Sequence, residues 1–477
     1  GDVSIDVRGE AASGNWRYAI DRSSHPDGSR LVAGGTGLGL TDIVNLPIIK
    51  SGFSLSPELT AWFSGDGKLD RARFQIGVDQ GVFKIANDPP RTVDRLLIAA
   101  TWDATTDVVR IEPIEIVAGS TLLTGTGTFT PPDDGSDTWR YSLNADTARI
   151  APDDVDGPPL DIPVLSVSGT IIPSRSYLTF DRFVARSVSG AMMGAGSFDF
   201  GPHGPNLAAA LSLSPMSAAT LMRLWPVTVG YEARKWVVDN VRSGQIETAE
   251  MEFSLLPLDM DGDPQTNSAM ERTIDIAVTY RDASLVLPGE LPAMVSAAGK
   301  AVVANQHVTL DATSAALVPP EGGRVEVEDF YADIPSVIAR PPIGTIRARL
   351  SGPAAAMASL ADQEPIDALK LLAVAPSDLS GSVSARINAV GPLGQMIEPD
   401  ALKWSVDAQL SDVASAVPIQ NKTVKGATLS VIADATQASL KGKATVDGVN
   451  ATIDYTAVFA GADQGQAGDV SFVLTEA

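Results

Sequence analysis

The side chains that most often act as bases, nucleophiles and metal ligands are scarce in this sequence. Its 477 residues include three histidines, His25, His203 and His307, and no cysteine. The histidines are too far apart in the sequence to give the ligand spacing of a zinc site. No GxSxG, HExxH or Walker motif occurs, and carboxylate pairs such as Asp153 and Asp154 carry no catalytic meaning without geometry. We therefore predict that the protein is not an enzyme and needs no metal or cofactor.

Two short segments resemble ligand-binding loops but lack decisive residues. Residues 259–263 (DMDGD) begin like a calcium loop, yet Pro264 and Met270 stand where that loop requires Gly and Glu. Residues 34–39 (GGTGLG) lack the spacing of a dinucleotide-binding loop, and no βαβ pattern follows them. We interpret the first segment as a solvated acidic loop and the second as bulged β structure.

Composition narrows the classes of partner. The formal charge is −23, and a polyanion is a poor match for phosphate backbones, so we expect no nucleic-acid binding. Aromatic residues make up 6% of the chain, which is few for a carbohydrate-binding protein. The longest apolar stretch, residues 207–229, is interrupted by Pro215, Arg223 and Pro226, so we predict no transmembrane helix.

Alternation of apolar and polar residues is the main structural signal. The pattern runs through residues 250–255, 273–281, 403–410 and 453–459. One apolar and one polar face per strand is typical of antiparallel sheets. Helical patterns are few, and we expect helices mainly at 215–242 and 354–373, where Pro365 should split the second helix. The predicted fold is therefore mainly β, an elongated and curled antiparallel sheet, groove-like or taco-like, with a few short helices.

Internal similarity indicates repeated strand-and-turn units. Residues 120–129 resemble residues 189–198, with two glycines and a phenylalanine in the same places. Residues 299–313 resemble residues 442–456 in a similar way. A repeated unit that cannot bury its own apolar face favours an extended sheet in which neighbouring units cover one another.

One passage of the chain resembles a known family. The matching residues are Trp225-Pro226, ARKWV at 233–237 and GQI at 244–246. They resemble the "WP … ARxW … GxI" passage of YhdP-type members of the AsmA-like family. The resemblance implies two regions. Residues 1–214 would be an N-terminal AsmA-like β region, and residues 215–477 a YhdP-type central β region that opens with the helical segment 215–242.

The resemblance also implies a location and a function. Proteins of this family are anchored in the inner membrane of Gram-negative bacteria, and their long β-sheet carries an apolar groove that conducts phospholipids between the inner and outer membranes. By this reading the chain is a periplasmic segment, tethered by an N-terminal helix that the sequence does not include. Its partners would be phospholipid acyl chains and, through regions outside this chain, inner- and outer-membrane proteins. The strand pattern that begins at Val3 likewise predicts a piece of a longer protein.

The alternation of apolar and polar residues predicts which side chains line such a groove. On the apolar phase of their strands are Met251, Phe253, Leu255, Ile274, Ile276, Val278, Trp404, Val406, Ile453 and Phe459. We expect them to form one connected apolar face that holds or conducts acyl chains without catalysis. The same pattern fits a closed core, which would make the chain a structural or adaptor β-repeat protein of the cell envelope. A carbohydrate-binding β-repeat protein is a third and weaker interpretation.

Overall fold

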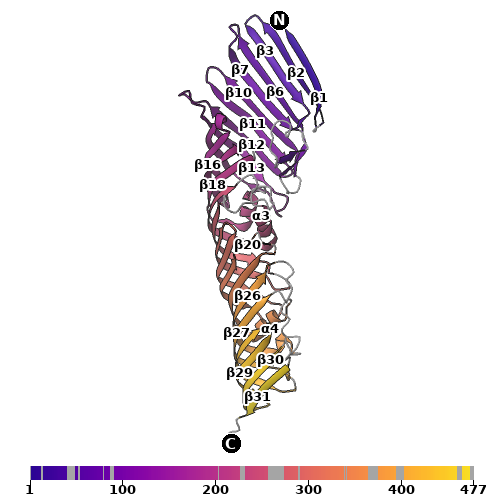
Figure 1. Ribbon diagram of the computed structural model, residues 1–477, viewed down its shortest axis with the longest axis vertical. Helices are drawn as coiled ribbons and strands as arrows, with labels where there is room; N and C mark the ends of the chain where they lie inside the picture. Colours follow the sequence, from indigo (N-terminus) through magenta and orange to yellow (C-terminus); the bar gives the residue numbers. More distant parts are fainter. Residues whose placement is uncertain are drawn as a thin grey trace. The chain divides into compact units, whose positions relative to one another are not determined.

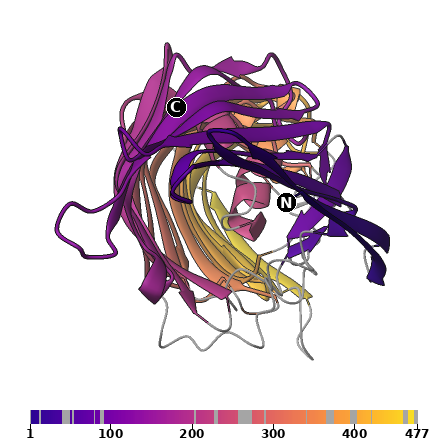
Figure 2. The same cartoon turned by 90° about the horizontal axis from the view of Figure 1, so that it is seen from above.

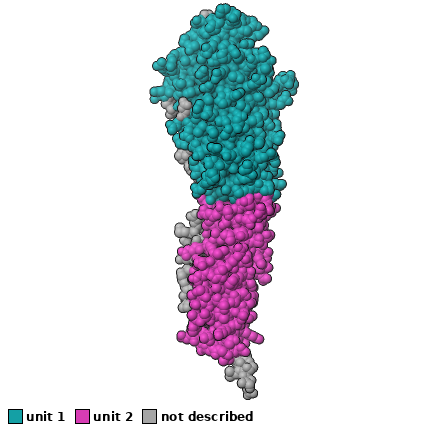
Figure 3. Space-filling view, turned by 180° about the vertical axis from the view of Figure 1, so that it is seen from behind, with its two compact units in different colours: residues 1–238, 248–274 teal, residues 239–247, 275–477 magenta. Residues whose placement is uncertain are grey.

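The computed structural model describes most of the chain and divides it into two units. The described residues are 2–11, 14–39, 49–51, 54–78, 80–85, 91–201, 204–225, 231–255, 273–287, 290–337, 339, 341–363, 374–393, 402–419, 421–458 and 465–472. Unit 1 comprises residues 1–238 and 248–274, and unit 2 comprises residues 239–247 and 275–477 (Figure 3).

Unit 1 consists mainly of long antiparallel strands, each paired with the next long strand along the chain (Figure 1). In order of pairing they are β1 (Val3–Ala11), β2 (Gly14–His25), β3 (Gly28–Thr36), β6 (Ser54–Ser64), β7 (Leu69–Val78), β10 (Arg95–Asp103), β11 (Val108–Ala118), β12 (Thr121–Thr130), β13 (Trp139–Ile150), β15 (Val164–Ile172), β16 (Tyr177–Ser187), β17 (Gly190–Gly201), β18 (Gly204–Leu213) and β20 (Val241–Leu255). The short strands are β4 (Leu38–Gly39), β14 (Leu160–Asp161) and β19 (Met216–Ser217), and β5 (Ile49–Ser51), β8 (Gly81–Ile85) and β9 (Arg91–Val93) form a separate sheet.

Unit 2 follows the same plan, with each strand paired to its neighbour in the sequence. Its strands are β21 (Thr273–Leu285), β22 (Met294–Ala304), β23 (His307–Leu317), β24 (Val325–Ile334), β25 (Ile343–Pro353), β26 (Leu379–Pro392), β27 (Lys403–Ser415), β28 (Val424–Asp434), β29 (Gln437–Val446), β30 (Val449–Val458) and β31 (Gly465–Phe472). Tight turns allow strands that follow one another in the sequence to pair. Asp447 and Gly448 both have positive φ between paired Val446 and Val449, as two-residue hairpins require.

β-Bulges interrupt several strand pairs. Asp282, Ser296, Asp329 and Asp412 have positive φ, and each lies at a shift of register. A bulge adds one residue to one strand, so the apolar residues on either side of it face the same way although they are three apart in the sequence. Leu410 and Val413 are an example. The bulges thus keep one face apolar where strict alternation would reverse it.

Three α-helices lie among the described residues. They are α2 (Ala218–Leu224), α3 (Tyr231–Asn240) and α4 (Ala354–Ala361). Ser217 caps α2, since its side chain accepts a hydrogen bond from the Thr220 amide. Seen from above, the helical segment between β19 and β20 lies to one side of the strands of its unit (Figure 2).

The predicted fold class is confirmed in its main part. The chain is mainly β, with a long antiparallel sheet and short helices. Helices occur in both regions where helical spacing predicted them, although β20 already begins at Val241 and α4 ends at Ala361. Residues 364–373, and with them the expected split at Pro365, lie outside the described residues, as does the acidic loop 259–263.

Candidate functional site

An unbroken row of apolar residues crosses the strands of unit 1. Each member pairs directly with the next, so all of their side chains point to one face of the sheet. The row is Ile5, Ile20, Ala33, Leu59, Phe74, Ala100, Ile111, Gly127, Leu143, Val167, Phe183, Gly194, Leu211 and Met251. This face is called the apolar face of unit 1.

Unit 2 has an apolar face built in the same way. One row of direct pairs is Val278, Ala301, Leu310, Ala332, Ile346, Ala389 and Trp404. A second row is Ala315, Val327, Leu350, Ala385, Ala408, Val431, Leu440 and Tyr455. The opposite face is polar: Glu328, Arg349, Arg386 and Asp407 form a cross-strand row of charges that are exposed to solvent.

The two rows of unit 2 differ in burial. From Ala315 to Ala408 the second row is buried, and α4 packs against β25 and β26 beside it. Ala354 at the start of α4 belongs to a core cluster with Val413 and Leu429, and Ile453 packs against that cluster. Every residue of the first row, from Val278 to Trp404, is half-buried. The row beside α4 is therefore covered, while the row from Val278 to Trp404 keeps access to solvent.

Aromatic side chains lie over glycines on the apolar faces. The direct pairs are Trp16 with Gly9, Tyr141 with Gly169, Phe180 with Gly196 and Tyr280 with Gly299. A Cβ added at Gly196 would come within 2.3 Å of the Phe180 ring and 2.4 Å of the Ala208 carbonyl oxygen. At Gly9 and Gly196 the place of the missing side chain is thus filled by an aromatic ring from the next strand, which stabilises glycine inside a strand.

Two of these aromatics are tyrosines that reach a third strand. The Tyr141 hydroxyl donates to the Thr179 carbonyl oxygen at 2.7 Å, and the Tyr280 hydroxyl donates to the Asp311 carbonyl oxygen at 2.7 Å. Burial is the main cause that raises the pKa of each phenol to about 12, and a nearby carboxylate, Asp181 or Asp311, adds to it. Both tyrosines are therefore neutral at physiological pH and serve as hydrogen-bond donors in an apolar setting.

Most residues predicted to line a groove have a described partner on the next strand, and all of these lie on the apolar faces. Met251 pairs with Leu211, Phe253 with Ala209 and Leu255 with Leu207 in unit 1. Ile276 pairs with Val303, Val278 with Ala301, Trp404 with Ala389, Val406 with Ile387 and Ile453 with Gly442 in unit 2. Ile274 lies two residues before Ile276 on β21 and is half-buried, and Phe459 is outside the described residues. These positions fall in two units, so the single connected face stays a prediction.

The segment 233–237, which resembles the YhdP-type passage, contains a buried arginine whose structural role the sequence did not predict. The Arg234 side chain is 1% exposed and pairs with both carboxylate oxygens of Asp154. Its Nε and Nη2 also donate to the carbonyl oxygens of Trp225 and Met222. Arg223 donates to the Asp156 carbonyl oxygen, so two arginines fasten the helical segment to the loop before β14. The Asp153-Asp154 pair, which has no catalytic meaning as a sequence motif, thus contributes one partner of a structural ion pair.

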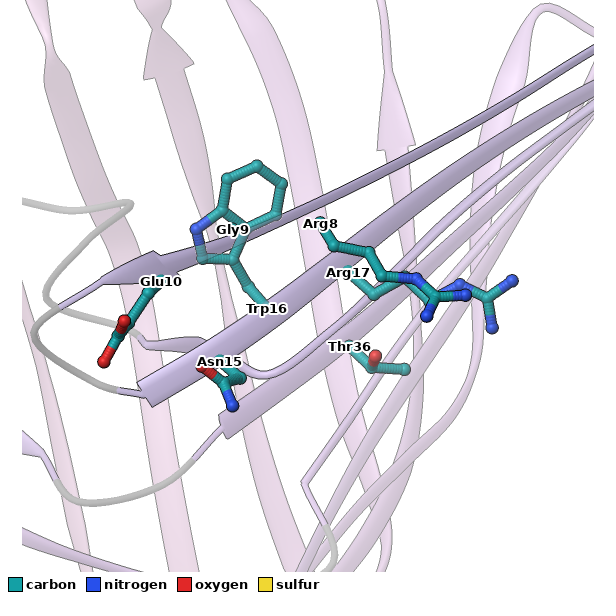
Figure 4. Close-up of a pocket in the computed structure, with 7 residues that line it drawn as sticks. All are labelled: Arg8, Gly9, Glu10, Asn15, Trp16, Arg17 and Thr36. Carbon is teal, nitrogen blue, oxygen red and sulfur yellow. The ribbon is translucent and has the colours of Figure 1, made fainter.

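A shallow hollow lies at one end of the β1–β2 hairpin. Arg8, Glu10, Asn15, Arg17 and Thr36 line it from alternate positions of β1–β3, with Gly9 and Trp16 between them (Figure 4). Figure 4 shows the Arg8 and Arg17 guanidinium groups side by side, with the Trp16 ring apart from them. Both arginines bind Asp6, which neutralises part of their charge and lowers the pKa of that carboxyl. The side chains around this hollow are thus mostly polar, and part of their charge is already neutralised.

The described residues hold neither a metal-binding cluster nor a membrane-spanning helix. Among the described residues, no group of His, Asp and Glu side chains is placed to hold a metal ion, and no helix is long and apolar enough to span a bilayer. Comparison with protein-family models, with curated proteins and with solved structures finds no match.

Proposed function

We propose that this chain is a non-catalytic segment that holds or conducts phospholipid acyl chains along its apolar faces. The fold establishes a long antiparallel sheet. That this sheet bends enough to form a groove is part of the proposal. The location between the inner and outer membranes of a Gram-negative cell, and the membrane proteins at either end, come from the resemblance to YhdP-type AsmA-like proteins. Those features are part of the proposal.

The observation that carries the proposal is the half-buried row from Val278 to Trp404. A closed core would bury such a row as completely as the row from Ala315 to Ala408. A continuous apolar strip that keeps access to solvent is unusual for a protein without an apolar ligand. Its side chains are aliphatic apart from Trp404, which suits flexible hydrocarbon chains better than rings or sugars.

The second candidate is a structural or adaptor β-repeat protein of the envelope. The buried row beside α4 and the core cluster around Ala354 favour it, because there the apolar face is covered by the protein's own side chains. The two candidates differ in what happens when a charge is introduced into the half-buried residues.

The test introduces single carboxylates on defined rows and measures folding and lipid contact together. Ile276→Asp and Val406→Asp charge half-buried positions, Ala408→Asp charges a buried one, and Ser405→Asp charges the polar face. We expect Ala408→Asp to unfold the chain, because an unpaired buried carboxylate costs several kcal/mol, on the order of the total stability. Ser405→Asp should behave as the parent does.

In the groove proposal, Ile276→Asp and Val406→Asp keep their fold by circular dichroism and lose crosslinking to a photoreactive diacyl phospholipid, while Ser405→Asp retains it. If the parent gives no crosslink and both half-buried variants unfold, the face is an ordinary core and the structural candidate replaces the proposal.

A further inference from the structure

Arg22 breaks the apolar face of unit 1. It lies two residues after Ile20 on β2, and its direct partners are Val3 on β1 and Leu31 on β3. The same row continues through Ala61, Ala72, Trp102, Val109, Phe129 and Tyr141. Among the described residues that pair across strands on this face from β1 to β20, Arg22 is the single charged one.

The Arg22 guanidinium lacks a carboxylate partner. Its one described side-chain contact is a long hydrogen bond of 3.4 Å to the Ser29 hydroxyl, and no ion pair involves it among the described residues. The neighbouring carboxylates are engaged elsewhere: Asp21 accepts from Ser4, and Asp2 accepts from the Ser24 amide. Arg22 is exposed, so its guanidinium is accessible to an anionic ligand.

A hollow lies beside this cation. Arg22, Leu31, Phe63 and Gly67 line a space of about 230 Å³. Phe63 pairs with Ser29, so the hydroxyl, the phenyl ring and Leu31 lie on the same face as the guanidinium. The hollow therefore offers a cation beside two apolar side chains, and the Ser29 hydroxyl lies 3.4 Å from that cation.

We propose that this hollow binds the anionic phosphate head of an acyl-chain lipid whose chains lie on the apolar face. A guanidinium binds phosphate oxygens through two parallel N–H bonds, and the Ser29 hydroxyl can donate a third. The apolar rows next to it take the chains. This inference rests on the proposed function and adds to it a defined place, at β2 and β3, where a headgroup is held.

The test compares probes that differ in one part. The purified, delipidated chain is titrated with dioctanoyl phosphatidylglycerol, which has both chains and phosphate, with dioctanoylglycerol, which has the chains alone, and with inorganic phosphate. The variants are Arg22→Gln, Arg22→Lys and the matched control Arg30→Gln. Arg30 is exposed on the next strand and points to the polar face, where it lies over the Trp62 ring.

We expect Arg22→Gln to weaken phosphatidylglycerol binding about tenfold, because a charge-assisted bidentate contact is lost. Binding of dioctanoylglycerol should stay within about twofold, since its chains meet only the apolar rows. Arg22→Lys should recover part of the loss, because lysine keeps the charge without the planar fork. Arg30→Gln should leave both affinities unchanged.

The other outcomes distinguish a failure of the headgroup site from a failure of the proposed acyl-chain binding. If both lipids bind and Arg22→Gln weakens them equally or not at all, the headgroup site is wrong and the groove stands. If the parent binds neither lipid, the proposed function fails and this inference fails with it. Binding of inorganic phosphate as tight as that of the lipid, lost in Arg22→Gln, would identify a free-anion site and overturn the inference.

Discussion

Single residues set how closely the strands of this protein approach one another. Residues 120–129 and 189–198 are similar in sequence, and the two glycines of each segment occupy equivalent positions in the structure. Gly125 and Gly127 pair with Ile114 and Ile111 on either side of a bulge, as Gly194 and Gly196 pair with Phe183 and Phe180. The sequence could reveal that the glycines recur. It could not reveal the aromatic rings that cover glycines such as Gly196, since each ring comes from a neighbouring strand.

Replacing Gly194 by alanine should therefore destabilise unit 1. The new Cβ would lie 2.3 Å from the Ala210 carbonyl oxygen and 2.4 Å from a Leu211 methyl, and backbone cannot yield easily. We expect a loss of about 1–3 kcal/mol, typical of overpacking. Gly77→Ala is the control, because its nearest neighbour would be 3.8 Å away. Urea unfolding measures both, and equal midpoints for the two variants would contradict the close approach.

The Tyr280 phenol should make stability fall at alkaline pH. Its pKa is raised to about 12 in the folded chain, against about 10 for an ordinary tyrosine. The folded state thus keeps a proton that the unfolded state releases, so this contribution is complete below about pH 10 and is lost as the pH rises toward 12. In Tyr280→Phe, the free energy of unfolding should decline less steeply over that interval.

At neutral pH the same variant should lose about 1 kcal/mol, because its hydrogen bond to the Asp311 carbonyl is gone. Tyr18→Phe serves as the control, since Tyr18 is an exposed tyrosine. Urea unfolding at several pH values between 9 and 12 provides the measurement. A slope in Tyr280→Phe as steep as that of the parent would refute the assignment.

At the scale of elements, alternation and helical spacing predicted much of the fold. Both helical regions and the strands around residues 251, 276, 404 and 453 were found from the pattern, because an apolar residue at every second position leaves few alternatives. The bulges were missed. Tyr280 and Ala283 face the same side across three residues, which a period of two excludes, and the turn-forming Asp282 between them was the available signal. Helix α4 ends earlier than its apolar pattern suggested.

The helical segment of unit 1 should depend on its ion pair to the loop before β14. Asp154→Ala leaves the Arg234 guanidinium, 1% exposed, with carbonyl partners alone. We expect a loss of about 2–3 kcal/mol, below the range for a fully buried pair because the Asp154 side chain is 36% exposed. Asp161→Ala removes the exposed pair with Arg149 and should cost less than about 1 kcal/mol.

Differential scanning calorimetry of the two variants measures this difference. The double variant Asp154→Ala, Arg234→Met should recover part of the stability, because no unpaired charge is then left in the interior. A double variant less stable than the sum of its single losses would show that Arg234 acts through packing and not through its charge.

For the molecule as a whole, the sequence predicted which residues share a face but not how far that face is covered. Val278 and Ala385 look alike as members of alternating strands, yet the first is half-buried and the second is buried in the row beside α4. Coverage depends on a helix that follows β25 and on strands distant in the sequence. No local pattern contains that information, and the choice between groove and core rests on it.

The net charge of −23 should make stability depend on salt. Like charges repel in the folded state, and the repulsion is screened once the Debye length falls to a few Å at high ionic strength. We expect the melting temperature to rise between low and high sodium chloride at pH 8, and to change little near the isoelectric point of about 4.4. A melting temperature at pH 8 that is flat or falls with salt would show that attractive ion pairs outweigh the net repulsion.

Pairing of each long strand with the next along the chain has a consequence for how the protein forms. Every such contact closes a short loop, so the entropy lost at each step is small and contact order is low for a β protein. A newly completed hairpin presents a free edge that templates the strand arriving behind it. Assembly can therefore proceed vectorially, in step with emergence of the chain, and late strands need not wait for distant partners. During such assembly the last strand formed has an unpaired edge, and this edge can pair wrongly with a strand of a second chain.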